Sequence, residues 1–75
     1  MTYTIKFSDG RTIDATDYGT EVTGLLADMV GPDVEIGDAE QDGMQDEDGA
    51  QPMRRLVWAS ADNGGSAVAT VRWTE

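Results

Sequence analysis

The sequence predicts a small α+β fold, in which an antiparallel sheet of two hairpins carries one helix packed on one face. Three observations predict it, and together they give the element order ββα(β)ββ. One stretch has the apolar period of an amphipathic helix, and a pair of strand-like segments precedes it and another pair follows it. In chain order these segments are residues 2–7, 12–16, 17–31, 53–60 and 67–73.

The helix is predicted from one apolar stripe with a 3.6-residue period. Asp17 can accept hydrogen bonds from the N–H groups of the first turn. Gly31 can adopt the left-handed conformation that ends a helix, and Pro32 cannot continue one. The rest of the chain has to cover the stripe, which consists of Tyr18, Val22, Leu25, Leu26, Met29 and Val30.

The first hairpin joins residues 2–7 and 12–16, and its apolar pattern selects the register. A two-residue Asp-Gly turn would put the apolar residues of the two strands on opposite faces. A three-residue loop puts them on one face, because it pairs Ile5 with Ile13. Since a one-residue slip turns every side chain to the other face, we predict the three-residue loop, with Gly10 in the left-handed conformation.

The second hairpin is predicted from Asn63-Gly64, a sequence typical of two-residue hairpin turns. This turn would pair Trp58 with Ala69, Leu56 with Val71 and Arg54 with Trp73. Leu56 and Trp58 would then face the helix together with Val71, and Trp73 would lie under Arg54 as a cation–π pair. The outer sheet face would receive three of the five basic residues, which are Lys6, Arg55 and Arg72.

Two segments lie between the helix and the second hairpin. In residues 32–36, Val34 and Ile36 alternate with acids, which predicts a short strand. Residues 37–52 contain three glycines and one large apolar residue, Met44, so we predict an exposed, mobile acidic loop. We assign the whole chain, 1–75, to a single α+β domain with one thin core.

Charge is the strongest global signal, because fifteen acids against five bases give a formal net charge of −10. There is no basic residue between Arg11 and Arg54, and this interval holds twelve of the acids. Such a surface repels nucleic acid and anionic lipid and attracts basic partners. The acids of the interval are Asp14, Asp17, Glu21, Asp28, Asp33, Glu35, Asp38, Glu40, Asp42, Asp46, Glu47 and Asp48.

The composition disfavours several classes of protein. The chain has no cysteine for a disulfide or thiolate site, and no histidine, the commonest general base and metal ligand. Ser8, Ser60 and Ser66 lie near predicted turns, with no histidine to activate them. The start, MTYTIKF, lacks the pattern of a signal peptide, and no apolar run approaches the length of a membrane span. We therefore expect a cytoplasmic protein that is not an enzyme and has no cofactor.

A calcium loop is a minor alternative. Asp38, Glu40, Asp42 and Gly43 match positions one, three, five and six of an EF-hand loop, and Asp46 matches position nine. Position twelve requires a bidentate glutamate but is a glycine here, and no helix is predicted after the loop. We therefore favour a solvated charge run and expect no metal site.

The acidic surface is the best functional lead. We expect a non-enzymatic module that binds a basic protein surface. The specific form of this expectation is DNA mimicry, in which carboxylates take the place of phosphates in the groove of a nucleic-acid-binding protein. Small acidic inhibitors of restriction or CRISPR effectors, from phages and mobile elements, are an analogy at the level of size and charge. The candidate partner-binding residues are Glu21, Asp28, Asp38, Glu40, Asp42, Asp46, Glu47 and Asp48.

Charge density limits the comparison with DNA. Residues 33–48 hold eight acids and span at most about 55 Å when extended, which is one charge per about 7 Å. Duplex DNA carries one charge per ~1.7 Å of its axis, so the loop alone is a sparse copy. Asp17, Glu21 and Asp28 of the predicted helix would widen the acidic patch.

The alternative is that the acids serve solubility only. One lysine, four arginines and ten aspartates are also typical of salt adaptation or of a genome rich in G and C. Function would then lie in ordinary protein contacts, including a homodimer formed through the outer sheet face or an edge strand. A salt titration separates binding to a basic partner from salt adaptation. Added salt weakens binding to a basic partner, whereas it stabilises a fold whose negative charges repel one another.

Overall fold

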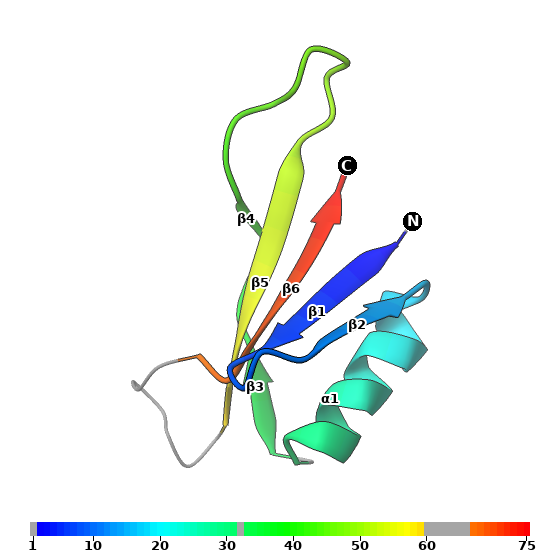
Figure 1. Cartoon of the computed structure of the whole chain (residues 1–75), viewed down its shortest axis with the longest axis vertical. Coiled ribbons are helices and arrows are strands. Elements are labelled where there is room, and N and C mark those ends of the chain that lie inside the picture. Colours follow the sequence, from blue (N-terminus) through cyan, green and yellow to red (C-terminus); the bar gives the residue numbers. More distant parts are fainter. Residues whose placement is uncertain (1, 32, 60–66) are drawn as a thin grey trace.

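The computed structural model describes residues 2–31, 33–59 and 67–75, and it has the predicted small α+β fold (Figure 1). Within these ranges the strands form one antiparallel sheet in the order β2-β1-β6-β5-β3, and β4 also pairs with β5. The elements are β1 (Tyr3–Phe7), β2 (Thr12–Ala15), η1 (Tyr18–Val22), α1 (Thr23–Met29), β3 (Val34–Ile36), β4 (Glu40–Gln41), β5 (Pro52–Ala59) and β6 (Ala69–Thr74).

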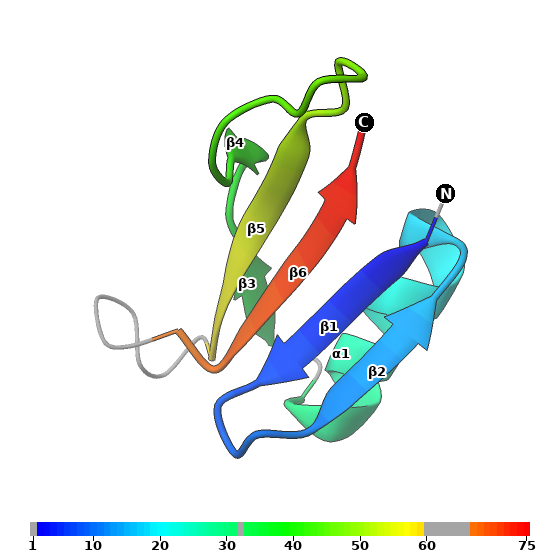
Figure 2. The same cartoon turned by 45° about the horizontal axis from the view of Figure 1, so that its top comes forward.

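The pairing of β1 with β6 joins the two hairpins into one sheet (Figure 2). Ile5 lies opposite Val71 in this pairing, so the first and the last strand are neighbours in the middle of the sheet. One edge is β2, and the other is formed by β3 and β4 along β5. No helix in the described ranges has both the length and the hydropathy of a membrane-spanning segment.

The first hairpin confirms the predicted register. Ile5 lies opposite Ile13, and the three-residue loop is closed by hydrogen bonds from the Phe7 N–H to the Arg11 carbonyl and from the Gly10 N–H to the Phe7 carbonyl, each 2.9 Å. Gly10 has a φ of +97°, in the left-handed region, as its place in the loop requires. Here the apolar pattern alone was sufficient to predict the pairing.

The predicted helix is present, but it begins with a wide turn. The N–H groups of Glu21 and Val22 both donate to the Asp17 carbonyl, at 3.0 and 3.1 Å, so η1 has π-type hydrogen bonding before α1 begins. Asp17 is the N-cap, as predicted, and its carboxylate accepts the Gly19 N–H. Gly31 follows the last turn with a φ of +136°. The predicted role of the proline at position 32 lies outside the described residues.

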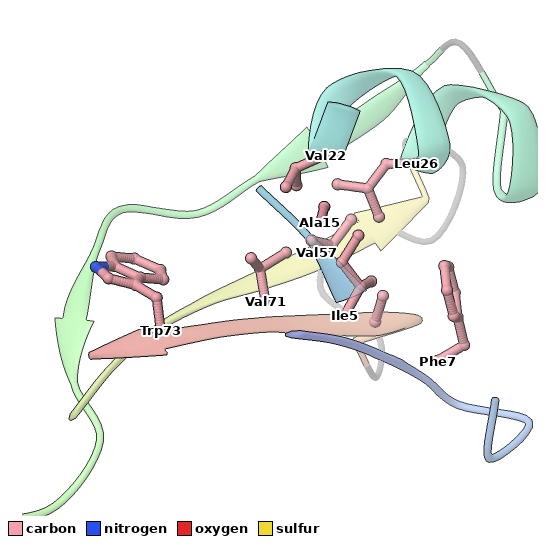
Figure 3. Packing of buried hydrophobic residues seen from close by; sticks show 9 residues of the cluster. Ile5, Phe7, Ala15, Val22, Leu26, Val57, Val71 and Trp73 are labelled. Atoms are coloured by element: carbon pink, nitrogen blue, oxygen red, sulfur yellow. The ribbon is translucent and has the colours of Figure 1, made fainter. Parts of the chain in front are cut away.

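The core lies between the helix and the middle of the sheet (Figure 3). Val22 and Leu26 project from the helix onto the sheet, and both are fully buried. The other residues of the predicted stripe are partly buried against this cluster, which confirms the stripe. The buried residues of the described ranges are Ile5, Phe7, Ala15, Val22, Leu26, Val57, Ala69, Val71 and Trp73.

The predicted register of the second hairpin is wrong by one residue. Val57 lies opposite Ala69, where the prediction placed Trp58, and Met53 lies opposite Trp73, where it placed Arg54. The prediction depended on a two-residue turn at Asn63-Gly64, which lies outside the described residues. Because a one-residue slip exchanges the faces of a strand, Arg55 and Val57 face the helix, and Arg54, Leu56 and Trp58 lie on the outer face.

Contacts at the edge of the sheet explain the observed register. Gly37 donates its N–H to the Leu56 carbonyl at 2.8 Å, and the Trp58 ring lies against this glycine on the outer face. A Cβ on Gly37 would be only 3.1 Å from the Trp58 ring, so glycine makes room for the indole there. The small helix therefore does not have to cover this large side chain, which is half-buried at the sheet edge instead.

Candidate functional site

A row of polar side chains crosses the outer face of the sheet, the face away from the helix. Its members lie directly opposite one another on successive strands, and Thr4 donates a hydrogen bond to the Asp14 carboxylate at 3.2 Å. The row brings two arginines side by side in the middle and a carboxylate at each end. From β2 to β4 it consists of Asp14, Thr4, Arg72, Arg54 and Glu40.

A bulge between β3 and β4 brings acidic side chains to this face. Ile36 lies opposite Val57 and Glu40 lies opposite Arg54, so the chain advances four residues where β5 advances three. One extra residue in a strand reverses the alternation of side chains beyond it. Glu40 therefore points to the outer face, whereas regular alternation from Ile36 would have turned it toward the helix.

The bulge places two of the candidate partner-binding residues in ion pairs. Glu40 Oε1 lies 2.8 Å from Arg54 Nε, and Asp42 bridges the two arginines, with Oδ2 2.9 Å from Arg72 Nε and Oδ1 3.4 Å from Arg54 Nη1. The Asp42 N–H also donates to the Pro52 carbonyl at 2.9 Å. We call Glu40, Asp42, Arg54 and Arg72 the arginine clamp. It attaches the first part of the predicted loop to the sheet.

The second part of the loop projects beyond the end of β5 (Figures 1 and 2). We call residues 43–51 the acidic tip. Asp46 organises it, because Oδ1 accepts the N–H groups of Asp48 and Ala50, each at 2.9 Å. Met44 at the tip is 90% exposed. The region predicted as one mobile loop is thus part strand, part clamp and part hydrogen-bonded turn.

The tip acids have no basic neighbour in the described part of the chain. Asp46, Glu47 and Asp48 are all exposed, and none of them forms an ion pair with any lysine or arginine within the described ranges. The base of the tip is tied to the last strand, because the Gln51 N–H donates to the Glu75 carbonyl and the Glu75 N–H donates to the Gln51 carbonyl, at 2.8 and 2.9 Å. The structure therefore holds three consecutive carboxylates in solvent on a closed loop.

The remaining candidate residues lie apart from the tip. Glu21 and Asp28 are exposed on the helix, which lies on the β1–β2 side of the sheet, away from the projecting tip (Figures 1 and 2). Glu21 accepts hydrogen bonds from the N–H and hydroxyl groups of Thr16, at 3.2 and 2.9 Å. Asp38 is exposed in the bulge. The eight candidates therefore do not form one group.

The acids are not arranged as the calcium template requires. Of the residues matched to the template, Glu40 and Asp42 contact arginines, and one oxygen of Asp46 accepts two backbone N–H groups. Across residues 2–31, 33–59 and 67–75, no group of three or more acidic side chains is placed to hold a metal ion. The clamp and the tip turn thus engage Glu40, Asp42 and Asp46, three of the four carboxylates that the template would have used, and Asp38 is exposed in the bulge.

Arg55 has a different environment from Arg54, which precedes it in β5. It faces the helix side, with its guanidinium carbon 5.1 Å from the Tyr18 ring centre and 5.8 Å from that of Trp73. Its Nη1 donates to the Gly37 carbonyl at 3.0 Å. The predicted cation–π pair over Trp73 is thus made by Arg55, not Arg54, which is a further consequence of the register.

Among residues 2–31, 33–59 and 67–75, two aspartates have lowered pKa values, and both are in local turns. The Arg11 N–H and the Arg11 guanidinium donate to Asp9 and hold the pKa of its carboxyl below 3.8. The Thr20 hydroxyl, followed by the Gly19 N–H, lowers the pKa of Asp17. The hydrogen bonds of these two aspartates serve the first hairpin loop and the start of the helix.

The arginine clamp was not predicted from the sequence. The predicted register of the second hairpin turned Arg54 toward the helix, and residues 37–52 were predicted to form a single exposed loop. A signal was present in Gly37, because a glycine directly after an alternating strand is typical of a bulge.

No protein-family model matches the chain, and no curated protein or solved structure resembles it at a significant level. The function therefore has to be argued from the surface itself.

Proposed function

We propose that this chain is a non-enzymatic acidic module that binds a basic protein surface, with the acidic tip as its main contact. The observation that supports it is the combination of Met44, which is 90% exposed, with three consecutive carboxylates that form no ion pair within the described ranges. The carboxylates attract a cationic surface over a distance, and the flexible methionine side chain adds apolar contact area.

DNA mimicry is the specific form that we propose. Glu40 and Asp42 are neutralised by the chain's own arginines, so the contact depends on the tip, with Glu21, Asp28 and Asp38 as secondary groups. Three successive residues of the tip carry a carboxylate, so negative charge is denser there than in the rest of the acidic segment. The proposed partner is a nucleic-acid-binding protein in the cytoplasm, such as a host defence effector.

A second candidate function is ordinary protein contact through the sheet. Leu56 and Trp58 lie half-buried on the outer face, where the predicted register did not place them, and β2 is an edge strand. A partner or a second copy could use this face or an edge. In that case the acids serve solubility, and neutralising the tip has no effect on binding.

A matched pair of variants separates the two functions. Glu47→Gln with Asp48→Asn removes two charges from the tip, and Asp33→Asn with Glu35→Gln removes two exposed charges elsewhere, so both variants have the same net charge. Each is immobilised and incubated with cell lysate at low and high salt, with and without duplex DNA as a competitor. Circular dichroism verifies that both remain folded.

The proposal predicts a captured protein that is released by salt and by duplex DNA. It also predicts that the tip variant loses this protein and that the matched variant retains it, because the same overall charge is removed at a different place. Capture that is equal for both variants, or that is insensitive to salt and DNA, would contradict the proposal and favour contact through the sheet.

A further inference from the structure

Three basic side chains lie near one another on the outer face, between carboxylates at its two edges. Lys6, Arg72 and Arg54 lie on β1, β6 and β5, three neighbouring strands, and their side chains share the outer face. Arg54 and Arg72 are directly opposite each other, at a spacing where Cβ atoms of a strand pair are about 4.5–5.5 Å apart. A carboxylate bridges the two guanidinium groups, and Arg54 has a second carboxylate partner, Glu40, at 2.8 Å.

The bridging carboxylate is that of Asp42, and it lies closer to Arg72 than to Arg54. It reaches Arg72 Nε at 2.9 Å but Arg54 Nη1 only at 3.4 Å. One carboxylate has two oxygens and one charge, so it cannot give both arginines the paired, two-point contact that a guanidinium favours. In the described part of the chain, the two Nη groups of Arg72 form no hydrogen bond.

Open space adjoins Arg72 on both sides. A shallow hollow of about 450 Å³ is lined by Thr2, Thr4, Thr74, Arg72 and Asp42, together with Pro52, Met53 and Trp73. A second hollow of about 260 Å³ is lined by Lys6, Thr70 and Arg72, with other residues of β1 and β6 and of the loop after β1. Arg72 is common to both, with threonines lining the first hollow and Lys6 lining the second.

We propose that Arg54 and Arg72 form a binding site for a phosphate group, and that Asp42 occupies this site in the unliganded chain. A phosphate carries more oxygens and more charge than a carboxylate, so it can contact both guanidinium groups and the threonine hydroxyls of the hollow. It binds by displacing Asp42 from the arginine clamp. This site does not depend on the proposed function of the acidic tip.

The test is a titration of the ¹⁵N-labelled chain with inorganic phosphate, and separately with O-phosphoserine, at constant ionic strength. Sodium chloride serves as the blank. We expect saturable amide shifts centred on Arg54, Arg72 and Thr74. Saturation by inorganic phosphate alone identifies the free ion as the ligand, and tighter binding of phosphoserine identifies a phosphate ester. Either result supports the site, and shifts no larger than with chloride overturn it.

Variants locate the site. Asp42→Asn removes the resident carboxylate and should tighten phosphate binding about tenfold, because one nearby negative charge is lost. Glu47→Gln makes the same change of net charge in the acidic tip and should leave the affinity unchanged. Equal tightening by both variants would show a general charge effect and overturn the proposal. If Asp42→Asn does not fold, Arg72→Gln decides the question, because saturable binding that survives it excludes this site.

Discussion

Residues 38–42 and 43–51 are both rich in acids, but their carboxylates have different surroundings. In the first segment, Glu40 and Asp42 contact arginines of the sheet. In the acidic tip, no carboxylate forms an ion pair with a basic side chain of the described ranges. The bulge after Gly37 makes the difference, because it turns the first segment toward the arginines. The number of acids in a sequence therefore gives its charge, whereas strand register decides which acids remain available to a partner.

The strongest way to break this comparison is to crowd the chain at Gly37, where the bulge begins. Gly37→Val would put a side chain 3.1 Å from the Trp58 ring and 3.3 Å from the Leu56 carbonyl oxygen. We expect a loss of about 1–3 kcal/mol in the free energy of unfolding, because overfilled positions force their neighbours apart. Urea denaturation measures this loss. Introducing Gly37→Val into a Trp58→Ala background should cost less, and an equal cost would show that the ring contact is unimportant.

Removing the bridging carboxylate sharpens the comparison. Asp42→Ala leaves Arg54 and Arg72 opposite each other without an anion, whereas Asp48→Ala removes the same charge from the tip. We expect Asp42→Ala to lower the free energy of unfolding by about 1 kcal/mol relative to Asp48→Ala, as for a small network of surface ion pairs. The difference should shrink at high salt. Equal stabilities in urea denaturation would mean that the clamp has no structural role.

Within the tip, Asp46 has a structural role that Glu47 lacks, because its carboxylate accepts backbone hydrogen bonds. Asp46→Ala removes the acceptor for the N–H groups of Asp48 and Ala50. We expect faster hydrogen exchange at these two amides and a change in global stability of less than about 0.5 kcal/mol. Glu47→Ala is the control and should leave both exchange rates unchanged. Unchanged rates in Asp46→Ala would show that the tip does not depend on this hydrogen-bonded turn.

The smallest effect concerns pH and the start of the helix. The Thr20 hydroxyl and the Gly19 N–H lower the pKa of Asp17 below its ordinary value of 3.8. The folded state therefore binds this proton more weakly than the unfolded state, so the stabilisation is complete above pH 3.8 and is lost as the pH falls through the lowered pKa. Thermal unfolding of Asp17→Asn should show less loss of stability below pH 3.8 than the parent chain. Equal losses would contradict this role.

The two hairpins show how far the sequence could predict the fold. In the first, Ile5 and Ile13 could share the buried face in only one register, so the apolar pattern was decisive. In the second, both faces of β5 carry apolar residues, with Val57 on one and Leu56 on the other. The pattern was therefore ambiguous, and the prediction relied on a turn motif that implied the wrong register.

The candidate site was predictable only in part. The charge and the gap without basic residues identified the acidic segment. The sequence did not show that Glu40 and Asp42 would meet Arg54 and Arg72, because that contact depends on the bulge and on the register of β5 together. The bulge adds one residue to its strand, and the register of β5 differs from the prediction by one residue. Either change turns side chains from one face of the sheet to the other.

The most direct test of the central claim compares the two acidic segments with one defined cationic probe. Calorimetric titrations with an oligolysine peptide at several salt concentrations would be carried out on Glu47→Gln with Asp48→Asn and on Glu40→Gln with Asp42→Asn. Both variants lose two charges. Because the clamp carboxylates contact arginines, whereas the tip carboxylates form no ion pair in the part of the chain that the structure describes, we predict that the tip variant loses more affinity and more salt dependence. Equal losses in the two variants, or a larger loss in the clamp variant, would contradict the account.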